Sequence, residues 1–98
     1  MRVGVTRFSH AMERQLRRSS HKGGWRYCDD TYLEGRLDEE VLELRSAINR
    51  AHLELVGGGI SSATFKEIET EAADVGNFAM MLVEHWRQYA KPKARSKP

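Results

Sequence analysis

Both prolines of this chain, Pro92 and Pro98, lie close to its C-terminus, so no proline can break a helix before residue 92. The clearest interruptions are instead two glycine clusters, at residues 23–24 and 57–59. Elsewhere apolar residues recur every three or four positions, which is the spacing of one face of a helix. Alternating apolar and polar runs, which indicate β-strands, are absent from the sequence. The sequence therefore predicts an all-α chain of three helices.

The first predicted helix is short and covers about residues 6–22, with a thin apolar stripe among many arginines. The second begins at residue 30 or 31 and continues to about residue 55, and the third runs from about residue 62 to about residue 90. Thr31 with Glu34, and Thr64 with Glu67, have the spacing of capping boxes at the two starts. The two longer helices are expected to form an antiparallel hairpin about the second glycine cluster.

Each long helix of this hairpin would extend for about 39 Å. One short extra helix cannot cover apolar faces of that length, so a second copy of the chain is expected to complete them. We predict a long helix hairpin plus a short N-terminal helix, completed as an intersubunit bundle of the four-helix type. The chain would then be a homodimer or a dimer of dimers. Residues 1–90 are expected to form one helical domain, and residues 91–98 a basic, flexible tail.

Composition narrows the cellular setting. The sequence has no run of about 18 apolar residues and no N-terminal apolar segment of signal-peptide length, so no membrane association is expected. A single cysteine, Cys28, excludes an internal disulfide framework and is typical of a reducing compartment. We therefore expect a cytoplasmic protein, located in the host cytoplasm if a phage encodes it. The net charge of +2 does not by itself indicate a partner.

Four carboxylates occupy unexpected positions on the two long helices. Glu71 lies within the apolar face of the third helix, and Asp74 lies one turn further along at the edge of that face. On the second helix, Glu40 and Glu43 border the apolar stripe in the same way, whereas Glu39 points toward solvent. In an antiparallel hairpin both pairs lie at comparable distances from the glycine loop and face the same space. Burying such carboxylates without compensation costs several kcal/mol each.

A hard divalent cation would compensate these charges, because Mg²⁺ takes oxygen ligands and commonly binds substrate phosphates as well. We therefore interpret Glu40, Glu43, Glu71 and Asp74 as candidate metal ligands for Mg²⁺, with Mn²⁺ as a possible substitute. The alternative is that the carboxylates are solvated charges that form ion pairs with arginines of the second helix. The arginines that could serve in this way are Arg36, Arg45 and Arg50.

The segments "RLDEEVLELRSAI" and "EIETEAADVGNFAMML" resemble the MazG-like all-α nucleoside triphosphate pyrophosphohydrolases. The family signature of Glu-x-x-Glu, a spacer and Glu-x-x-Asp is similar to Glu40-Val-Leu-Glu43, residues 44–70 and Glu71-Ala-Ala-Asp74. The resemblance covers about residues 24–86. It is closest to short phage and bacterial members described as dATP/dGTP pyrophosphohydrolase-like.

The resemblance implies a Mg²⁺-dependent enzyme that converts a nucleoside triphosphate to the monophosphate and pyrophosphate, for control of the nucleotide pool. It implies that the four carboxylates are both the metal ligands and the catalytic residues, and a purine deoxynucleotide, dGTP or dATP, is the first substrate to test. Larger relatives carry a basic segment on a fourth helix, whereas this chain has only its basic tail after residue 90. The cationic ligands of the phosphates are therefore expected from that tail, from the N-terminal arginines and lysines, or from a neighbouring subunit.

Several further residues are candidates for binding the nucleotide. Trp25 could stack on a base or could equally anchor the connection between the first two helices. Phe78 could pack against the sugar, although core packing is the simpler interpretation. Asn77 points away from Glu71, which favours a subunit contact or a cap over metal binding. The cationic candidates are Arg18, Lys22 and Lys91.

A noncatalytic helical module is the alternative function, an oligomer that binds nucleotides or nucleic acid without turning them over. Nucleic acid is not the expected partner, because no aromatic residues are interleaved with the basic ones and no reading motif is present. The four histidines lack metal-ligand spacing, so the sequence does not predict a zinc site.

Overall fold

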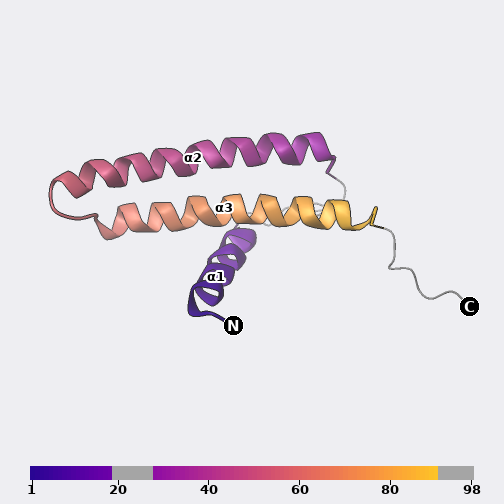
Figure 1. Cartoon of the computed structure of the whole chain (residues 1–98), viewed down its shortest axis with the longest axis horizontal. Coiled ribbons are helices and arrows are strands. Elements are labelled where there is room, and N and C mark those ends of the chain that lie inside the picture. The colour runs from indigo at the N-terminus through magenta and orange to yellow at the C-terminus, as the bar shows by residue number, and fades with distance from the viewer. Residues whose placement is uncertain (19–27, 91–98) are drawn as a thin grey trace, which may run out of the picture.

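The computed structural model describes residues 1–18 and 28–90, and the secondary structure of these ranges is entirely helical. The helices are α1 (Val3–Arg18), α2 (Asp30–Val56) and α3 (Ser62–Arg87). Figure 1 shows α2 and α3 side by side as a long antiparallel hairpin, with α1 against α3 on the side away from α2. The all-α class and the three predicted helices are thus confirmed. Within the described ranges, no helix is both long and apolar enough to cross a membrane.

The starts of α2 and α3 agree with the prediction from the sequence, but their capping residues do not. Asp29 caps α2, and its side chain accepts a hydrogen bond from the backbone N–H of Tyr32. Ser61 caps α3 in the same way through the backbone N–H of Thr64. The capping boxes predicted at Thr31 and Thr64 are therefore wrong, because a good capping residue already stands just before each helix.

The other helix bounds differ by a few residues from the prediction. α1 begins at Val3 rather than near residue 6, and its predicted end at residue 22 lies outside the described residues. α3 ends at Arg87 rather than near residue 90. The predicted basic tail, residues 91–98, also lies outside the described residues.

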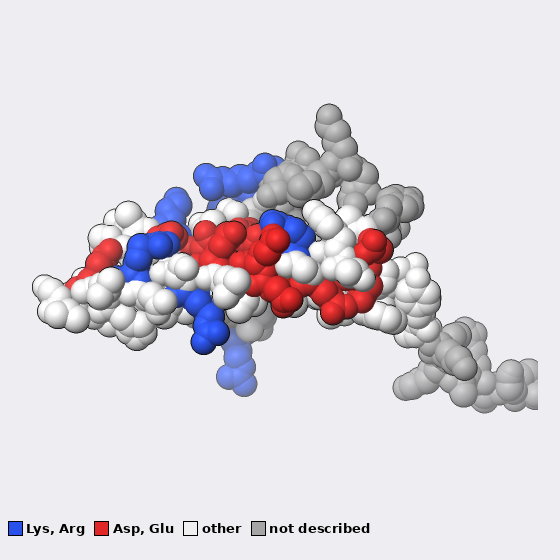
Figure 2. Space-filling view, turned by 90° about the horizontal axis from the view of Figure 1, so that it is seen from above, with Lys and Arg blue, Asp and Glu red and all other residues white. Residues whose placement is uncertain are grey.

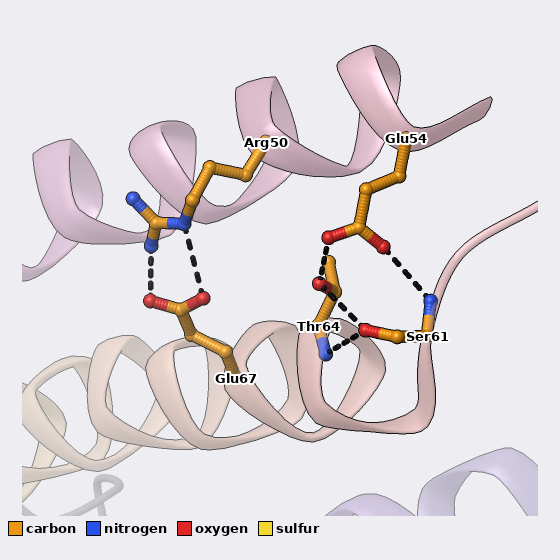
Figure 3. Close-up of polar contacts among 5 residues, drawn as sticks. All are labelled: Arg50, Glu54, Ser61, Thr64 and Glu67. Atoms are coloured by element: carbon orange, nitrogen blue, oxygen red, sulfur yellow. Dashed lines mark hydrogen bonds and ion pairs between the residues drawn. The ribbon is translucent and has the colours of Figure 1, made fainter. Parts of the chain in front are cut away.

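Polar contacts hold the two long helices together at the loop end of the hairpin (Figure 3). Arg50 of α2 donates through both Nε and Nη2 to the carboxylate of Glu67 on α3. Glu54 accepts hydrogen bonds from the Thr64 hydroxyl and from the backbone N–H of Ser61. These two hydrogen bonds hold the pKa of Glu54 below its usual value. Together the contacts fix the register of α2 against α3.

At the open end of the hairpin, the Trp86 indole donates to Asp30 Oδ1 at 2.9 Å. Between these two ends, α2 buries the small side chains of Ala47 and Ala51 against α3. Leu33 is the one large side chain among the described residues that is fully buried. The hairpin is thus a thin layer with a small core.

The packing of α1 on α3 depends on two neighbouring residues of α3. A Cβ atom at Gly76 would lie only 2.9 Å from the ring of Phe8 and 3.3 Å from the sulfur of Met12, so glycine lets the two helices approach closely. The adjacent Asn77 is 3% exposed, and its Nδ2 donates to the backbone carbonyl of Met12 at 3.0 Å. α1 is therefore held by shape at Gly76 and by a buried hydrogen bond at Asn77.

One chain leaves much apolar surface on its long helices uncovered. The large apolar side chains of α2 and α3 that are more than half exposed are Tyr32, Leu42, Leu53, Leu55, Val56, Phe65, Val83 and Trp86. Surface of this extent is typical of a face that associates with another molecule. It supports the predicted intersubunit bundle, which remains a prediction.

We expect light scattering at micromolar concentration to give at least twice the 11.2 kDa mass of one chain. Burial of these apolar side chains against a second copy supplies the driving force. A folded, monodisperse monomer at the same concentration would contradict the prediction.

Candidate metal centre

The hairpin brings three of the four predicted carboxylates together at its middle. One oxygen atom from each of Glu40, Glu43 and Glu71 lies within 4.8 Å of those of the other two. Figure 2 shows that acidic side chains gather over this part of the α2–α3 hairpin. The convergence follows from the matched register of the two helices. We call these three residues the glutamate cluster.

Asp74 stands beside the glutamate cluster rather than within it. Its Oδ1 accepts a hydrogen bond from Nε2 of Gln15 on α1, at 3.2 Å. Gln15 therefore joins α1 to the edge of the site, a contact that the sequence did not indicate. The i, i+3 spacing places Asp74 about one turn beyond Glu71 on α3.

Two carboxylate oxygens of the cluster are buried without a hydrogen-bond partner, Glu40 Oε1 and Glu71 Oε1. The Glu40 side chain is almost entirely buried, and that of Glu71 is half-buried. An unpartnered buried carboxylate oxygen is costly, and native proteins rarely leave one without a compensating group. The donor set therefore fits a hard cation, since each residue offers carboxylate oxygen and the three ligand atoms are close together.

The electrostatics of the cluster also favour a positive partner. Burial raises the pKa of Glu71 to about 7, and the neighbouring Glu43, Asp74 and Glu40 add to this effect. Burial likewise raises the pKa of Glu40, although the nearby Arg36 opposes the change. The pKa of Asp74 is raised by burial and is pulled down in part by the hydrogen bond from Gln15. Either a proton or a cation can relieve this excess of negative charge.

Arg36 is a residue of the site whose role the sequence left open. Its Nη2 donates to Glu40 Oε2 at 2.8 Å, and its Nη1 donates to the exposed Glu39. The guanidinium also lies over the ring of Phe78, 5.2 Å from the ring centroid. The i, i+4 spacing of Arg36 and Glu40 was the available signal for this pair.

The alternative interpretation, in which arginines of α2 form ion pairs with the carboxylates, holds for part of the site. Arg36 pairs with one oxygen of Glu40, whereas Arg50 pairs with Glu67, which lies outside the glutamate cluster. Among the described residues, no ion pair is found for Glu43 or Glu71. Internal ion pairing therefore compensates only one of the three clustered carboxylates.

The remaining candidates for nucleotide binding are placed as follows. Phe78 is half-buried and contacts Arg36, whereas Asn77 is buried and contacts α1 of the same chain. Arg18 is the last residue of α1. Trp25, Lys22 and Lys91 lie outside the described residues.

No family model and no curated protein matches the sequence, and no solved structure matches the chain. The resemblance described above therefore depends on the two carboxylate motifs and the residues around them. The site is interpreted below from its own geometry and charges.

We expect Glu71→Gln to raise the stability of the metal-free protein at neutral pH. Because the pKa of Glu71 is raised on folding, the folded state holds this proton more tightly than the unfolded state does. The contribution of Glu71 to the stability of the wild-type protein should therefore fall as the pH rises from about 4.5 to about 7. The variant has no such group and should gain roughly 1–2 kcal/mol at pH 8, since solvent screening at a half-buried site reduces the full effect.

Urea denaturation at pH 4 and pH 8 in metal-free buffer measures this difference. Glu84→Gln is the matched control, because Glu84 lies on the same helix and pairs locally with Arg87. The two variants should differ at pH 8 and agree at pH 4. Equal stability at both pH values would show that the carboxylate of Glu71 carries no burial cost.

A second substitution tests the contact between α1 and α3. Asn77→Ala removes a buried hydrogen bond to Met12 and should lower the free energy of unfolding by about 1–3 kcal/mol. Asn49→Ala, at an exposed position of α2, makes the same change in helix propensity without that loss. Equal urea midpoints for the two variants would contradict the docking role of Asn77.

Proposed function

We propose that this protein is a Mg²⁺-dependent nucleoside triphosphate pyrophosphohydrolase, which converts a purine deoxynucleoside triphosphate such as dGTP or dATP to the monophosphate and pyrophosphate. The observation that carries the proposal is the convergence of Glu40, Glu43 and Glu71, with two buried oxygens that have no partner. The resemblance to MazG-like enzymes supplies the reaction and the substrate class. The proposed activity belongs to nucleotide-pool control.

The chemistry assigns distinct tasks to the residues of the site. Glu40, Glu43 and Glu71 would hold the cation, and Asp74 lies at their edge, where it could complete the ligand set. Mg²⁺, or Mn²⁺ in its place, supplies positive charge for the triphosphate and lowers the pKa of a coordinated water. One of the α2 glutamates, Glu40 or Glu43, would accept the proton of that water. The oxygen of that water would form a bond to the α phosphorus as the bond from this phosphorus to the α–β bridging oxygen breaks, and pyrophosphate would leave with the bridging oxygen.

Arg36 would position Glu40 in this scheme. Its ion pair with Oε2 holds the carboxylate in one orientation, and Oε1 is the oxygen without a partner. The contact with Phe78 restrains the guanidinium in turn. The arrangement has the form of a ligand oriented by an outer residue.

A noncatalytic helical module is the competing function, and the ion pair between Arg36 and Glu40 favours it to a limited degree. In such a module the carboxylates would be structural, so replacing them would not affect any turnover. The two functions therefore differ in whether the carboxylates of the cluster are required for activity.

The deciding experiment incubates the protein with each canonical NTP and dNTP in the presence of Mg²⁺ and measures monophosphate and pyrophosphate. We expect Glu71→Gln to keep its helical circular dichroism and to lose about three orders of magnitude in pyrophosphate release, because a metal ligand is removed. Glu84→Gln should retain wild-type activity. The proposal fails if no nucleotide is cleaved by the wild type, or if Glu71→Gln is as active as Glu84→Gln.

A further inference from the structure

A second polar feature lies between α1 and α3, outside the glutamate cluster. It is a cleft with a volume of about 80 Å³, several times the volume that one water requires. Its polar lining comes from Arg14, Gln15 and Arg18 of α1 and from Lys66, Glu69 and Thr70 of α3. We call it the basic cleft.

The charges of the basic cleft do not balance. It has three cationic side chains and one carboxylate, and Arg14 Nη2 lies 3.4 Å from Glu69 Oε1. Among the described residues, neither Arg18 nor Lys66 forms an ion pair. Two positive charges from different helices are therefore left facing one small cleft. Guanidinium and ammonium groups in this arrangement favour an oxyanion, which accepts their N–H donors.

The cleft adjoins the candidate metal centre through Gln15. This side chain lines the cleft and also donates to Asp74 at the edge of the glutamate cluster. Thr70, on the opposite wall, precedes Asp74 by one helical turn, which is about 6 Å along α3. Asp74 and Gln15 would thus lie between an oxyanion in the cleft and the glutamate cluster.

We propose that Arg14, Arg18 and Lys66 form an oxyanion site that binds the terminal phosphates of a nucleoside triphosphate. The assignment of a triphosphate rests on the function proposed above, whereas the oxyanion site rests on the cleft and its charges. The site supplies the cationic phosphate ligands that the sequence does not provide on a fourth helix. α1 is then a part of the substrate site and not merely a support for the hairpin.

The test measures binding of inorganic tripolyphosphate by calorimetry in metal-free buffer, so that the glutamate cluster cannot contribute through a metal. The double substitution Arg14→Gln and Lys66→Gln should weaken binding by at least about tenfold, because charged donors are lost. Arg18→Gln should also weaken tripolyphosphate binding. Arg17→Gln is the matched control on α1, since Arg17 is exposed and pairs only with Glu13 among the described residues. Circular dichroism verifies that each variant remains helical.

The outcomes separate this proposal from the enzymatic one. Loss of tripolyphosphate binding in the double variant, with Arg17→Gln unchanged, supports the oxyanion site even if no nucleotide is hydrolysed. If the enzyme is active, the same variant should also raise KM for the cleaved nucleotide. Failure of the wild type to bind tripolyphosphate, or equal binding by the double variant and Arg17→Gln, overturns the oxyanion site whatever the activity.

Discussion

The packing of α2 against α3 brings several carboxylates close together, and their mutual repulsion is the constraint that the rest of the hairpin must offset. Glu40 is 4% exposed, and Glu43 and Glu71 place oxygens close to it. Such a cluster opposes the packing of the two helices that create it. The hairpin tolerates the repulsion because its register is fixed on both sides of the cluster. Arg50 and Glu54 hold the loop end, and the indole of Trp86 holds the open end.

Small residues in the hairpin allow α2 and α3 to pack closely. Ala47 and Ala51 of α2 are buried where larger side chains would force α2 and α3 apart. Close packing of this kind contributes little apolar area per residue, so the stability of a single chain is limited. Burial of the exposed apolar side chains of both long helices against another molecule would add to this limited stability. The chain combines a thin internal core with a large apolar surface available for association.

The sequence predicted the hairpin and its acidic residues because both depend on local periodicity. Each helix presents one face at a spacing of three and four residues, and a short glycine loop aligns the two faces. The convergence of Glu40, Glu43 and Glu71 follows from that alignment and could be predicted. The capping boxes were mispredicted because a capping motif was sought inside each helix while Asp29 and Ser61 already stood before it.

The contacts of α1 could not be predicted in the same way. Its apolar stripe is thin, so the sequence does not specify which helix it packs against or at what angle. Gly76 and Asn77 fix that angle through a close approach and a buried hydrogen bond, and neither belongs to an apolar periodicity. The link from Gln15 to Asp74 and the basic cleft both depend on this docking. Contacts made by a helix with only a thin apolar stripe, such as α1, therefore cannot be predicted from the spacing of its apolar residues.

The net charge of the site indicates whether arginines, protons or a cation neutralise its carboxylates. With Glu40, Glu43, Glu71 and Asp74 all ionised, Arg36 is the one cation among the described residues that forms an ion pair with them, and it neutralises one of the four charges. Protonation of Glu71, whose pKa is raised to about 7, removes one further charge near neutral pH.

A divalent cation removes two charges at once and competes directly with that proton. Cation binding at the cluster, as proposed, would therefore be coupled to proton release from Glu71 and would strengthen as the pH rises through about 7. Electrostatic attraction would likewise couple the glutamate cluster to the basic cleft. A cation held at the cluster would attract an oxyanion in the basic cleft, whose lining residue Gln15 contacts Asp74, so the two proposed sites would bind a cation and an anion cooperatively.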